Sequence, residues 1–583
     1  MKINTGSPAL NDKPMPALAD HASIGLVMLN ARYAHMAPAP RILRNEARRL
    51  GFGQTWLREY TLQTPVWKMA QDLLAQQPAL LGFSIYIWNR RETLELIELI
   101  KKLSPQTLTV VGGPEVSFGP RPSPYVDVLI AGEGETKWQD LLSTLSRGQQ
   151  PTAEQTARWA AYGNDLPPLT DLPYTEEDAP DLAHRLVYLE TSRGCPFTCA
   201  FCLSALDQRV RFFPEDAVKT HIAWLVAQGA RRIKFLDRTF NVRRERTLEF
   251  FRWLAGFADC QFHFEIVGDL LDTPLLDFLA QVPPGQFQFE VGIQTTDPAA
   301  QNRIARKQKL DTLLAHMARL RHQDRVNLHA DLIWGLPGET LADIQQSFRT
   351  VFALRPQELQ LGFLKFLPGA PIRAQIQAEG YVFQDQPPYE VIQHRCLSAL
   401  EVLALKRFEE VFDRFYNSGR FRFTLERLLE TLEPWALFDR LSRHWQQAGL
   451  DTQAPSLDEL YRQMALCFAP DVPAAELTDL LRLDYVYHRR VARLPAFMSP
   501  AATENLPHPP AGTRNGYTFL APFGHTLALE APGPTAPAGR ARLLPSPGWQ
   551  WYAVQYPDAE QGYFFRPTLR PLSTTPAQGP PAA

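Results

Sequence analysis

Three cysteines within eight residues are the part of the sequence best suited to chemistry. Cys195, Cys199 and Cys202 have the spacing Cys-x3-Cys-x2-Cys, in a chain of 583 residues with only six cysteines. A structural zinc site needs four ligands and usually draws them as two close pairs. Three thiolates on an iron–sulfur cubane would instead leave one iron open for chemistry. The spacing favours such a cluster, with zinc completed by a remote histidine or unligated cysteines as alternatives.

The cysteines directly follow a short apolar strand, and that strand begins a series. The run "LVYLETS" is followed by five further strand patterns, which are "RRIKFLD", "QFHFEIVG", "QFQFEVGIQ", "VNLHADLIWGLPG" and "ELQLGFLKFLPG". Six strands with helical crossovers predict a partial (βα)6 TIM-type barrel over residues 185–375. Reacting groups of such a barrel lie at the carboxyl ends of its strands, where the cysteine loop falls.

Another strand and helix series precedes the barrel. The runs "SIGLVMLN", "ALLGFSIYI", "TLTVVGG" and "VDVLIAGEGE" are typical of buried strands, with helical spacing between them. They predict a doubly wound parallel sheet over residues 23–147, with its ligand crevice beyond the carboxyl ends of the strands. Residues 1–22 are expected to be a flexible N-terminus. The Pro- and acid-rich residues 148–184 are expected to be a linker.

The C-terminal part of the sequence has a different pattern of apolar and polar residues. Long amphipathic segments such as "FTLERLLETLEPWALFDRLSRHWQQAGL" predict a mainly helical C-terminal domain over residues 376–570. Within it, residues 516–566 are aromatic and β-like, and residues 571–583 are expected to be a disordered tail. Tyr416, Asn417 and Arg420 lie in "DRFYNSGRF", where they could reach a substrate or simply pack on the barrel. The whole chain is thus predicted to be an α/β protein of three domains.

The charge balance argues against a general affinity for polyanions. The chain has 60 basic and 62 acidic residues and a formal net charge of -2, so it has no global field for nucleic acid or a membrane surface. The first residues, "MKINTGSPALNDKPMPALAD", lack an apolar signal core, and no later run reaches the length of a membrane span. We therefore expect a cytoplasmic protein with no membrane or nucleic-acid partner.

The cysteine loop resembles the signature of the radical S-adenosylmethionine (SAM) enzymes. The likeness rests on the cysteine spacing, on its place after the first barrel strand, and on Phe201 directly before the last cysteine. In that family three cysteines hold a [4Fe–4S] cluster, and an electron from it cleaves SAM to a 5′-deoxyadenosyl radical. The resemblance implies that Cys195, Cys199 and Cys202 ligate the cluster and that Phe201 lies near the adenine.

Later strand ends resemble SAM-binding positions of the same family. "FHFEIVGD" places Glu265 at the end of the third strand, and the resemblance implies contact with the methionyl group of SAM. Gln294 ends the fourth strand and Arg306 lies on the following helix, where the resemblance implies that they hold the ribose and the methionyl carboxylate. Taken singly, each of these side chains could equally be solvated or form a structural ion pair.

Two further segments complete the expected SAM site. "DLIWGLPGET" resembles the fifth-strand motif of the family, with Asp331 for a ribose hydroxyl and the backbone from Ile333 to Gly335 for adenine. Asp237 in "FLDRTFN" ends the second strand, where the family often has a polar residue near the SAM amino group. A helix cap explains Asp237 equally well.

The first domain resembles that of the cobalamin-binding subgroup of the family. The likeness lies in "LNARYAH", "VGGPEVSF" and "DVLIAGEGE". The Asp-x-His-x-x-Gly motif that supplies a histidine to cobalt in many cobalamin proteins is absent from the sequence, although cobalamin could bind without such a ligand. His35 is the nearest candidate for direct contact. No cysteine precedes Cys195, unlike in the methylthiotransferases, which carry a second cluster in their N-terminal domain.

The resemblance implies an enzyme that reductively cleaves SAM at a [4Fe–4S] cluster, using an electron donor such as flavodoxin or ferredoxin. With cobalamin bound, methyl transfer to an unactivated carbon is the expected reaction. A rearrangement or coupling without cobalamin is the alternative. A non-catalytic iron–sulfur or metal-binding adaptor protein is the alternative from another class.

Overall fold

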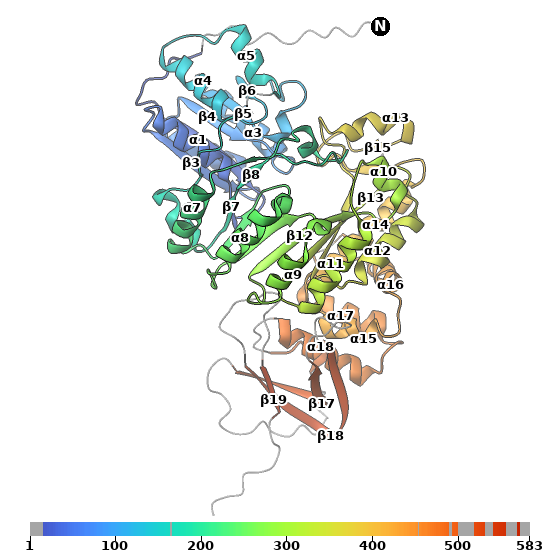
Figure 1. The fold of residues 1–583 in the computed structure, drawn as a ribbon. Helices are drawn as coiled ribbons and strands as arrows, with labels where there is room; N and C mark the ends of the chain where they lie inside the picture. Colours follow the sequence, from blue (N-terminus) through green and yellow to red (C-terminus); the bar gives the residue numbers. More distant parts are fainter. Residues whose placement is uncertain are drawn as a thin grey trace, which may run out of the picture.

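The computed structural model places three domains one after another along the molecule (Figure 1). The first domain lies at one end, the barrel in the middle, and the C-terminal helices and strands at the other end. The structure describes residues 15–163, 166–452, 454–488, 493–499, 518–530, 540–555 and 568–571. Among these residues, no helix has the length and apolar character that crossing a membrane requires.

The first domain is a five-stranded parallel sheet in the order β3-β1-β4-β5-β6. Its strands are β1 (Ile24–Asn30), β3 (Thr55–Thr61), β4 (Leu80–Ser84), β5 (Leu108–Gly112) and β6 (Val128–Ile130). Its helices are α1 (Pro38–Arg49), α2 (Val66–Ala75), α3 (Arg90–Leu103) and α4 (Glu135–Ser146). This is the flavodoxin-like strand order, whose ligand crevice opens between β1 and β4 at their carboxyl ends.

The predicted doubly wound sheet is confirmed, with one strand that the sequence analysis missed. Every residue of β1 is buried, as expected of a parallel strand covered on both faces. The missed strand β3 lies at the sheet edge and is buried only in part, so polar residues interrupt its apolar pattern.

Two segments predicted to be flexible or linking are packed against the first domain. Leu18 is only 2% exposed, and its N–H donates to Leu145, so the prediction of a flexible N-terminus is wrong for residues 15–22. Residues 1–14 lie outside the described residues. The predicted linker contains helix α5 (Ala153–Ala160), whose Trp159 is fully buried. It also contributes Asp178, which forms buried ion pairs with Arg41 and Arg44.

The barrel sheet has seven strands in the order β14-β13-β12-β11-β10-β7-β2. The six predicted strands are β7 (Leu186–Leu189), β10 (Arg232–Phe235), β11 (Gln261–Ile266), β12 (Phe287–Gln294), β13 (Asn327–Trp334) and β14 (Glu358–Phe363). The seventh is β2 (His35–Met36), which belongs to the first domain in sequence and pairs in parallel with β7. A strand of two residues has no periodicity, so the sequence carried no signal for it.

Helices cover the outer face of the barrel sheet (Figure 1). They are α7 (Glu215–Ala227), α8 (Arg244–Leu254), α9 (Thr273–Leu279), α10 (Pro298–Arg303), α11 (Leu310–Gln323) and α12 (Leu341–Phe352). Strand β12 alternates strictly between buried and half-buried residues. Its Phe287 and Phe289 pack on Phe251 of α8, so Glu290 and Gln294 point to the opposite, inner side of the sheet. The same alternation brings the polar side chains of neighbouring strands together.

The C-terminal part begins with the short helix α13 (Ile376–Glu379) and a hairpin of β15 (Val382–Phe383) and β16 (Val391–Gln393). Five helices follow, which are α14 (Ala399–Phe412), α15 (Arg422–Leu428), α16 (Pro434–Gln447), α17 (Leu457–Phe468) and α18 (Ala474–His488). An antiparallel sheet of β17 (Thr518–Glu530), β18 (Arg540–Gln555) and β19 (Thr568–Pro571) ends the described chain. These helices confirm the predicted mainly helical C-terminal domain, and strands β17 and β18 lie within residues 516–566, whose pattern was predicted to be β-like. Apart from Pro571, the predicted disordered tail lies outside the described residues.

Candidate functional site

The cysteine loop is the connection between two short antiparallel strands at the end of β7. The strands are β8 (Ser192–Arg193) and β9 (Arg211–Phe212). Gly194 has a positive φ of 91°, and a Cβ there would collide with the carbonyl oxygen of Arg209. Only glycine therefore fits the entry to the loop.

All three loop cysteines are free of disulfide bonds. The Cys199 thiol is buried and its sulfur accepts a hydrogen bond from Arg306 Nη1 at 3.4 Å. Cys195 Sγ lies 3.5 Å from Thr239 Oγ1. Burial raises the pKa of the Cys195 thiol, and a bound metal cation would favour its thiolate form.

The cysteine loop has free thiols and a nearby arginine, which suit an iron–sulfur cluster. Among the described residues, no three His, Cys, Asp or Glu side chains converge closely enough to hold one metal ion. Each thiolate of a cubane binds a different iron, so its ligands stand further apart than those of a single ion. A free, partly exposed set of thiols beside an arginine therefore fits an anionic iron–sulfur cluster.

Asp237 follows β10 and is almost fully buried, at 1% exposure. Its Oδ2 accepts the backbone N–H of Thr191, and its Oδ1 accepts the hydroxyls of Thr191 and Ser192. Burial raises the pKa of Asp237, against the effect of these hydrogen bonds. Asp237 therefore braces the start of the cysteine loop, and its contact with the SAM amino group stays a prediction.

Glu265, Gln294 and Arg306 lie on the inner side of the sheet near the cysteine loop. Burial raises the pKa of Glu265 to about 7, and Arg238 lies 3.9 Å from it. Gln294 has a positive φ of 72°, and its buried Oε1 has no hydrogen-bond partner within the protein. An unsatisfied buried acceptor is costly unless a ligand or water completes it. This geometry fits a bound SAM, and the individual contacts remain predictions.

The fifth-strand motif places two further predicted SAM contacts on the same side. Asp331 Oδ1 lies 3.0 Å from His329 Nε2. Although burial opposes the charged form, Asp331, Glu358 and Glu290 raise the pKa of His329 to about 9. Gly335 has φ of 83° and its carbonyl accepts the hydroxyl of Tyr381 at 3.0 Å.

The two apolar members of the predicted SAM site are both half-buried. Ile333 lies between Asp331 and Gly335 and packs against the barrel core. Phe201 packs against the same core from the cysteine loop. Both side chains can therefore form an apolar wall for an adenine ring, and both contacts stay predictions.

Charged side chains also fill the inner side of the barrel below these residues. Glu290 Oε2 lies 2.8 Å from Lys234 Nζ and 2.9 Å from His263 Nε2. Despite burial, these two neighbours hold the pKa of Glu290 well below its usual range. Barrel interiors are usually packed with branched apolar residues, so this ion-pair cluster makes the floor of the site polar.

The carboxyl edge of the first sheet has an aromatic pair at the expected crevice. Asn89 is fully buried and donates to the carbonyl oxygens of Leu29 and Ser84, which joins β1 to β4. Tyr86 and Trp88 stack beside it, with ring centroids 4.4 Å apart, and Trp88 is 44% exposed. An exposed aromatic surface at this edge fits a large planar cofactor.

His35 lies between the first strand and the first helix, as expected, on the short strand β2 at the edge of the barrel sheet. It is opposite Leu186 at the start of β7. Its Nδ1 is 2.6 Å from the Tyr188 hydroxyl, and burial lowers the pKa of its imidazole. The ring thus contacts the barrel, and its contact with cobalamin stays a prediction.

An arginine links the cysteine loop to the first domain. Arg193 Nη1 lies 2.8 Å from Glu133 and 2.7 Å from Glu135, and Arg193 Nε lies 2.8 Å from Glu190. Arg211 also pairs with Glu133. The sequence analysis missed these pairs, although the two glutamates lie in the "AGEGE" motif and Arg193 is two residues before Cys195.

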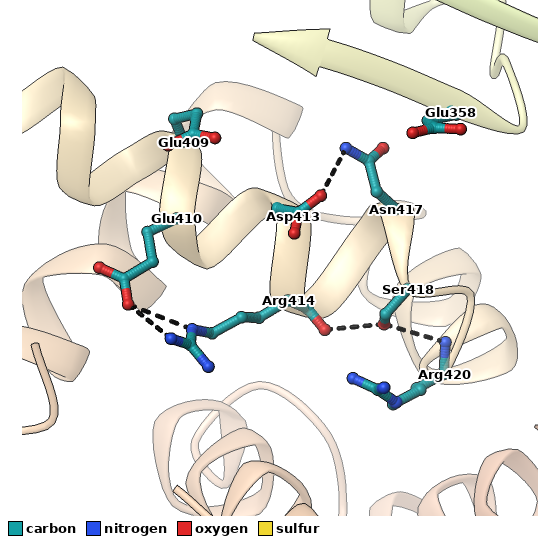
Figure 2. Close-up of a pocket in the computed structure, with 8 residues that line it drawn as sticks. All are labelled: Glu358, Glu409, Glu410, Asp413, Arg414, Asn417, Ser418 and Arg420. Carbon is teal, nitrogen blue, oxygen red and sulfur yellow. Dashed lines mark hydrogen bonds and ion pairs between the residues drawn. The ribbon is translucent and has the colours of Figure 1, made fainter. Parts of the chain in front are cut away.

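A separate cavity of about 530 Å³ lies beside the start of β14 (Figure 2). It is lined by Glu358, Glu409, Glu410, Asp413, Arg414, Asn417, Ser418 and Arg420. Glu358 begins β14, whereas the cysteine loop follows the end of the parallel strand β7. Tyr416 donates to Pro356, just before β14. Tyr416 thus packs on the barrel, which is one of the two expected roles, and Asn417 and Arg420 line this cavity, so that their contact with a substrate stays a prediction.

Three protein-family profiles match the chain in the order of its domains. A B12 binding domain matches residues 16–142, the radical SAM superfamily matches residues 189–351, and a protein of unknown function (DUF4080) matches residues 378–508. The chain therefore contains a radical SAM domain. Together with the B12 binding and DUF4080 domains, this domain order matches that of a cobalamin-dependent radical SAM subgroup, as the sequence predicted. The domains imply a [4Fe–4S] cluster, SAM and cobalamin as cofactors.

Two curated relatives are methyltransferases. The chain is 28% identical over 369 residues to the cobalamin-dependent radical SAM methyltransferase TokK of Streptomyces tokunonensis, covering 56% of this chain and 52% of TokK. It is 26% identical over 378 residues to 2-(S-pantetheinyl)-carbapenam-3-carboxylate methyltransferase of Streptantibioticus cattleyicolor, covering 56% and 53% respectively. The chain thus spans about half the length of these relatives.

Solved structures share the fold. The cobalamin-dependent radical enzyme OxsB superposes with a TM-score of 0.53 at 13% identity, over 79% of this chain and 75% of OxsB. The radical SAM methyltransferase TsrM of Kitasatospora setae superposes with a TM-score of 0.51 at 17% identity, over 65% and 84%. These likenesses confirm the predicted fold class.

Proposed function

We propose that the chain reductively cleaves SAM at a [4Fe–4S] cluster held by Cys195, Cys199 and Cys202, and that it transfers a methyl group with cobalamin. The observation that carries the proposal is the place of the three free thiols. They follow the first barrel strand, and ion pairs tie their loop to the carboxyl edge of the B12 binding domain. When bound, the cluster supplies an electron to SAM and cobalamin supplies a methyl carrier.

The chain's own residues would bind and orient these groups. Arg306 donates to Cys199 Sγ and so offsets negative charge on the thiolates. Gln294 offers an unsatisfied acceptor, and Glu265 a carboxylate whose pKa of about 7 makes its charge sensitive near neutrality. Phe201 and Ile333 would exclude water on the apolar side. Asp331 and the backbone at Gly335 would position the nucleoside, in line with the family motif.

Anaerobic reconstitution with iron and sulfide tests the proposal. We expect broad iron–sulfur absorbance in the wild type, its loss in Cys199→Ala, and its retention in Cys396→Ala, because Cys396 is exposed and remote in sequence from the loop. With reductant, SAM and cobalamin, we expect 5′-deoxyadenosine and S-adenosylhomocysteine. Cleavage of SAM without S-adenosylhomocysteine would favour the rearrangement or coupling enzyme. An unchanged spectrum in Cys199→Ala would refute the cluster assignment, and a cluster that never cleaves SAM would favour the adaptor protein.

We further propose a cytoplasmic setting and a small protein electron donor such as flavodoxin or ferredoxin. The support is the need of radical SAM chemistry for a one-electron reductant. Adding reduced flavodoxin to the reconstituted protein tests this donor. Reduction of the cluster is measured as a loss of the cluster's visible absorbance.

A further inference from the structure

The cysteine loop is closed at its base by two arginines. Arg193 of β8 and Arg211 of β9 are direct cross-strand partners, and the residues between them form the whole loop. Like charges directly opposite each other destabilise a strand pair. An anion that binds both arginines therefore offsets their repulsion at the base of the loop.

Glu133 of the first domain is that anion. Its Oε2 lies 2.8 Å from Arg193 Nη1, and its Oε1 accepts a hydrogen bond from Arg211 Nη2. Glu135 adds a second contact, 2.7 Å from Arg193 Nη1. The side chains of Arg193, Glu133 and Arg211 are only 14%, 21% and 21% exposed, so solvent and salt screen these pairs less than surface pairs.

We propose that Glu133 is a positioning residue that couples the ligand site of the first domain to the geometry of the cysteine loop. Glu133 follows β6 at the carboxyl edge of the first sheet, which is the edge where such sheets bind ligands. A ligand bound at this edge fixes the position of the Glu133 carboxylate. Through its ion pairs, Glu133 then fixes the positions of both arginines. The inference rests on the proposed function, because it requires that cobalamin and SAM both bind.

The connection from Arg193 to the first cysteine leaves little freedom. Gly194 is held at a φ of 91° against the carbonyl of Arg209. The N–H of Cys195 donates to the carbonyl of Asp207 at 3.0 Å. A displacement of Arg193 therefore moves Cys195 with it, and coupling between the two sites must act in both directions.

The test measures SAM affinity of the full-length, reconstituted protein with and without hydroxocobalamin, from the change that SAM causes in the electron paramagnetic resonance spectrum of the reduced cluster. We expect cobalamin to tighten SAM binding by at least about fivefold in the wild type, the lower end of common coupling. Glu133→Gln keeps the size of the side chain and loses its charge. In this variant we expect cobalamin to tighten SAM binding by less than about twofold. Asp72→Asn is the matched control, because Asp72 pairs with Arg58 within the first domain and should leave the ratio unchanged.

The inference is overturned if cobalamin leaves the SAM affinity of the wild type unchanged. It is also overturned if cobalamin tightens SAM binding in Glu133→Gln as much as in the wild type. If Glu133→Gln does not take up iron, hydrogen exchange of the cofactor-free full chain decides. Residues 192–212 should then exchange at least about tenfold faster than in the wild type, and unchanged exchange overturns the inference. A wild type that binds neither cofactor refutes the proposed function as well, whereas binding of both without the expected ratio refutes only the role of Glu133.

Discussion

Replacing Asp237 with alanine should loosen the start of the cysteine loop without touching any cysteine. The carboxylate accepts one backbone N–H, from Thr191, and two hydroxyls, from Thr191 and Ser192. A buried donor left without an acceptor costs about 1–3 kcal/mol. The Thr191 N–H cannot turn to another acceptor, whereas the Thr191 and Ser192 hydroxyls can rotate. We therefore expect Asp237→Ala to lower the local opening free energy by about 3 kcal/mol in total.

Hydrogen exchange of the Thr191 amide measures this loss of local opening free energy directly, because that amide donates to Asp237. A loss of about 3 kcal/mol in local opening free energy corresponds to about 100-fold faster exchange. Asp237→Asn should cost about 1 kcal/mol, because the amide oxygen can accept the N–H while its NH2 donates to the hydroxyls. Mass spectrometry of a peptide spanning residues 186–193 gives both rates, and Asp72→Ala controls for a lost carboxylate elsewhere.

The reasoning is refuted if Asp237→Ala speeds exchange of this peptide less than about tenfold. The result also separates two roles for the residue. If Asp237 instead holds the SAM amino group, Asp237→Asn should weaken SAM binding strongly while exchange near Thr191 hardly changes. If Asp237 braces the loop, Asp237→Ala should speed hydrogen exchange near Thr191 even in protein that contains no cofactor.

Two further changes test the buried charges of the barrel. Glu339, in the loop after β13, accepts hydrogen bonds from the Thr295 hydroxyl and the Leu336 N–H. Burial raises the pKa of Glu339 to about 8, so the folded chain holds a proton that the unfolded chain releases, and stability should fall as pH rises from about 5 to about 8. Calorimetry should show a smaller fall in Glu339→Gln, and an equal fall contradicts the assignment. Glu290→Gln leaves Lys234 without its ion-pair partner, which we expect to cost about 2 kcal/mol and to lower the Tm of the barrel by about 4–8 °C. A Tm equal to or above that of the wild type would show that the ion pair does not stabilise the barrel.

Local patterns in the sequence were sufficient to predict most of the fold. The strands of both sheets are short apolar runs, and the sequence placed Gln294 at the end of one of them, which is β12. The cysteine spacing predicted a loop with three metal-binding thiols, because all three residues lie on one turn of the chain. These features depend on neighbours only a few residues apart, and such patterns are visible in one sequence.

The partners of charged residues were beyond reach of the sequence. With 60 basic and 62 acidic residues in the chain, no pattern shows that Arg193 pairs with Glu133, 60 positions away. No pattern showed that the His35 ring would lie against the Tyr188 hydroxyl through the pairing of β2 with β7. Nor did any pattern show that the Asp237 carboxylate would accept the hydroxyls of Thr191 and Ser192.

The sequence by itself thus determined the three domains, the cysteine loop and its place after the first barrel strand. The tertiary structure decided how the first domain meets that loop, through the added strand β2 and the Glu133 ion pairs. The physical reason is that strand and turn patterns arise from short-range backbone and side-chain preferences. Ion pairs and edge-strand pairing arise only when the folded domains bring distant segments together.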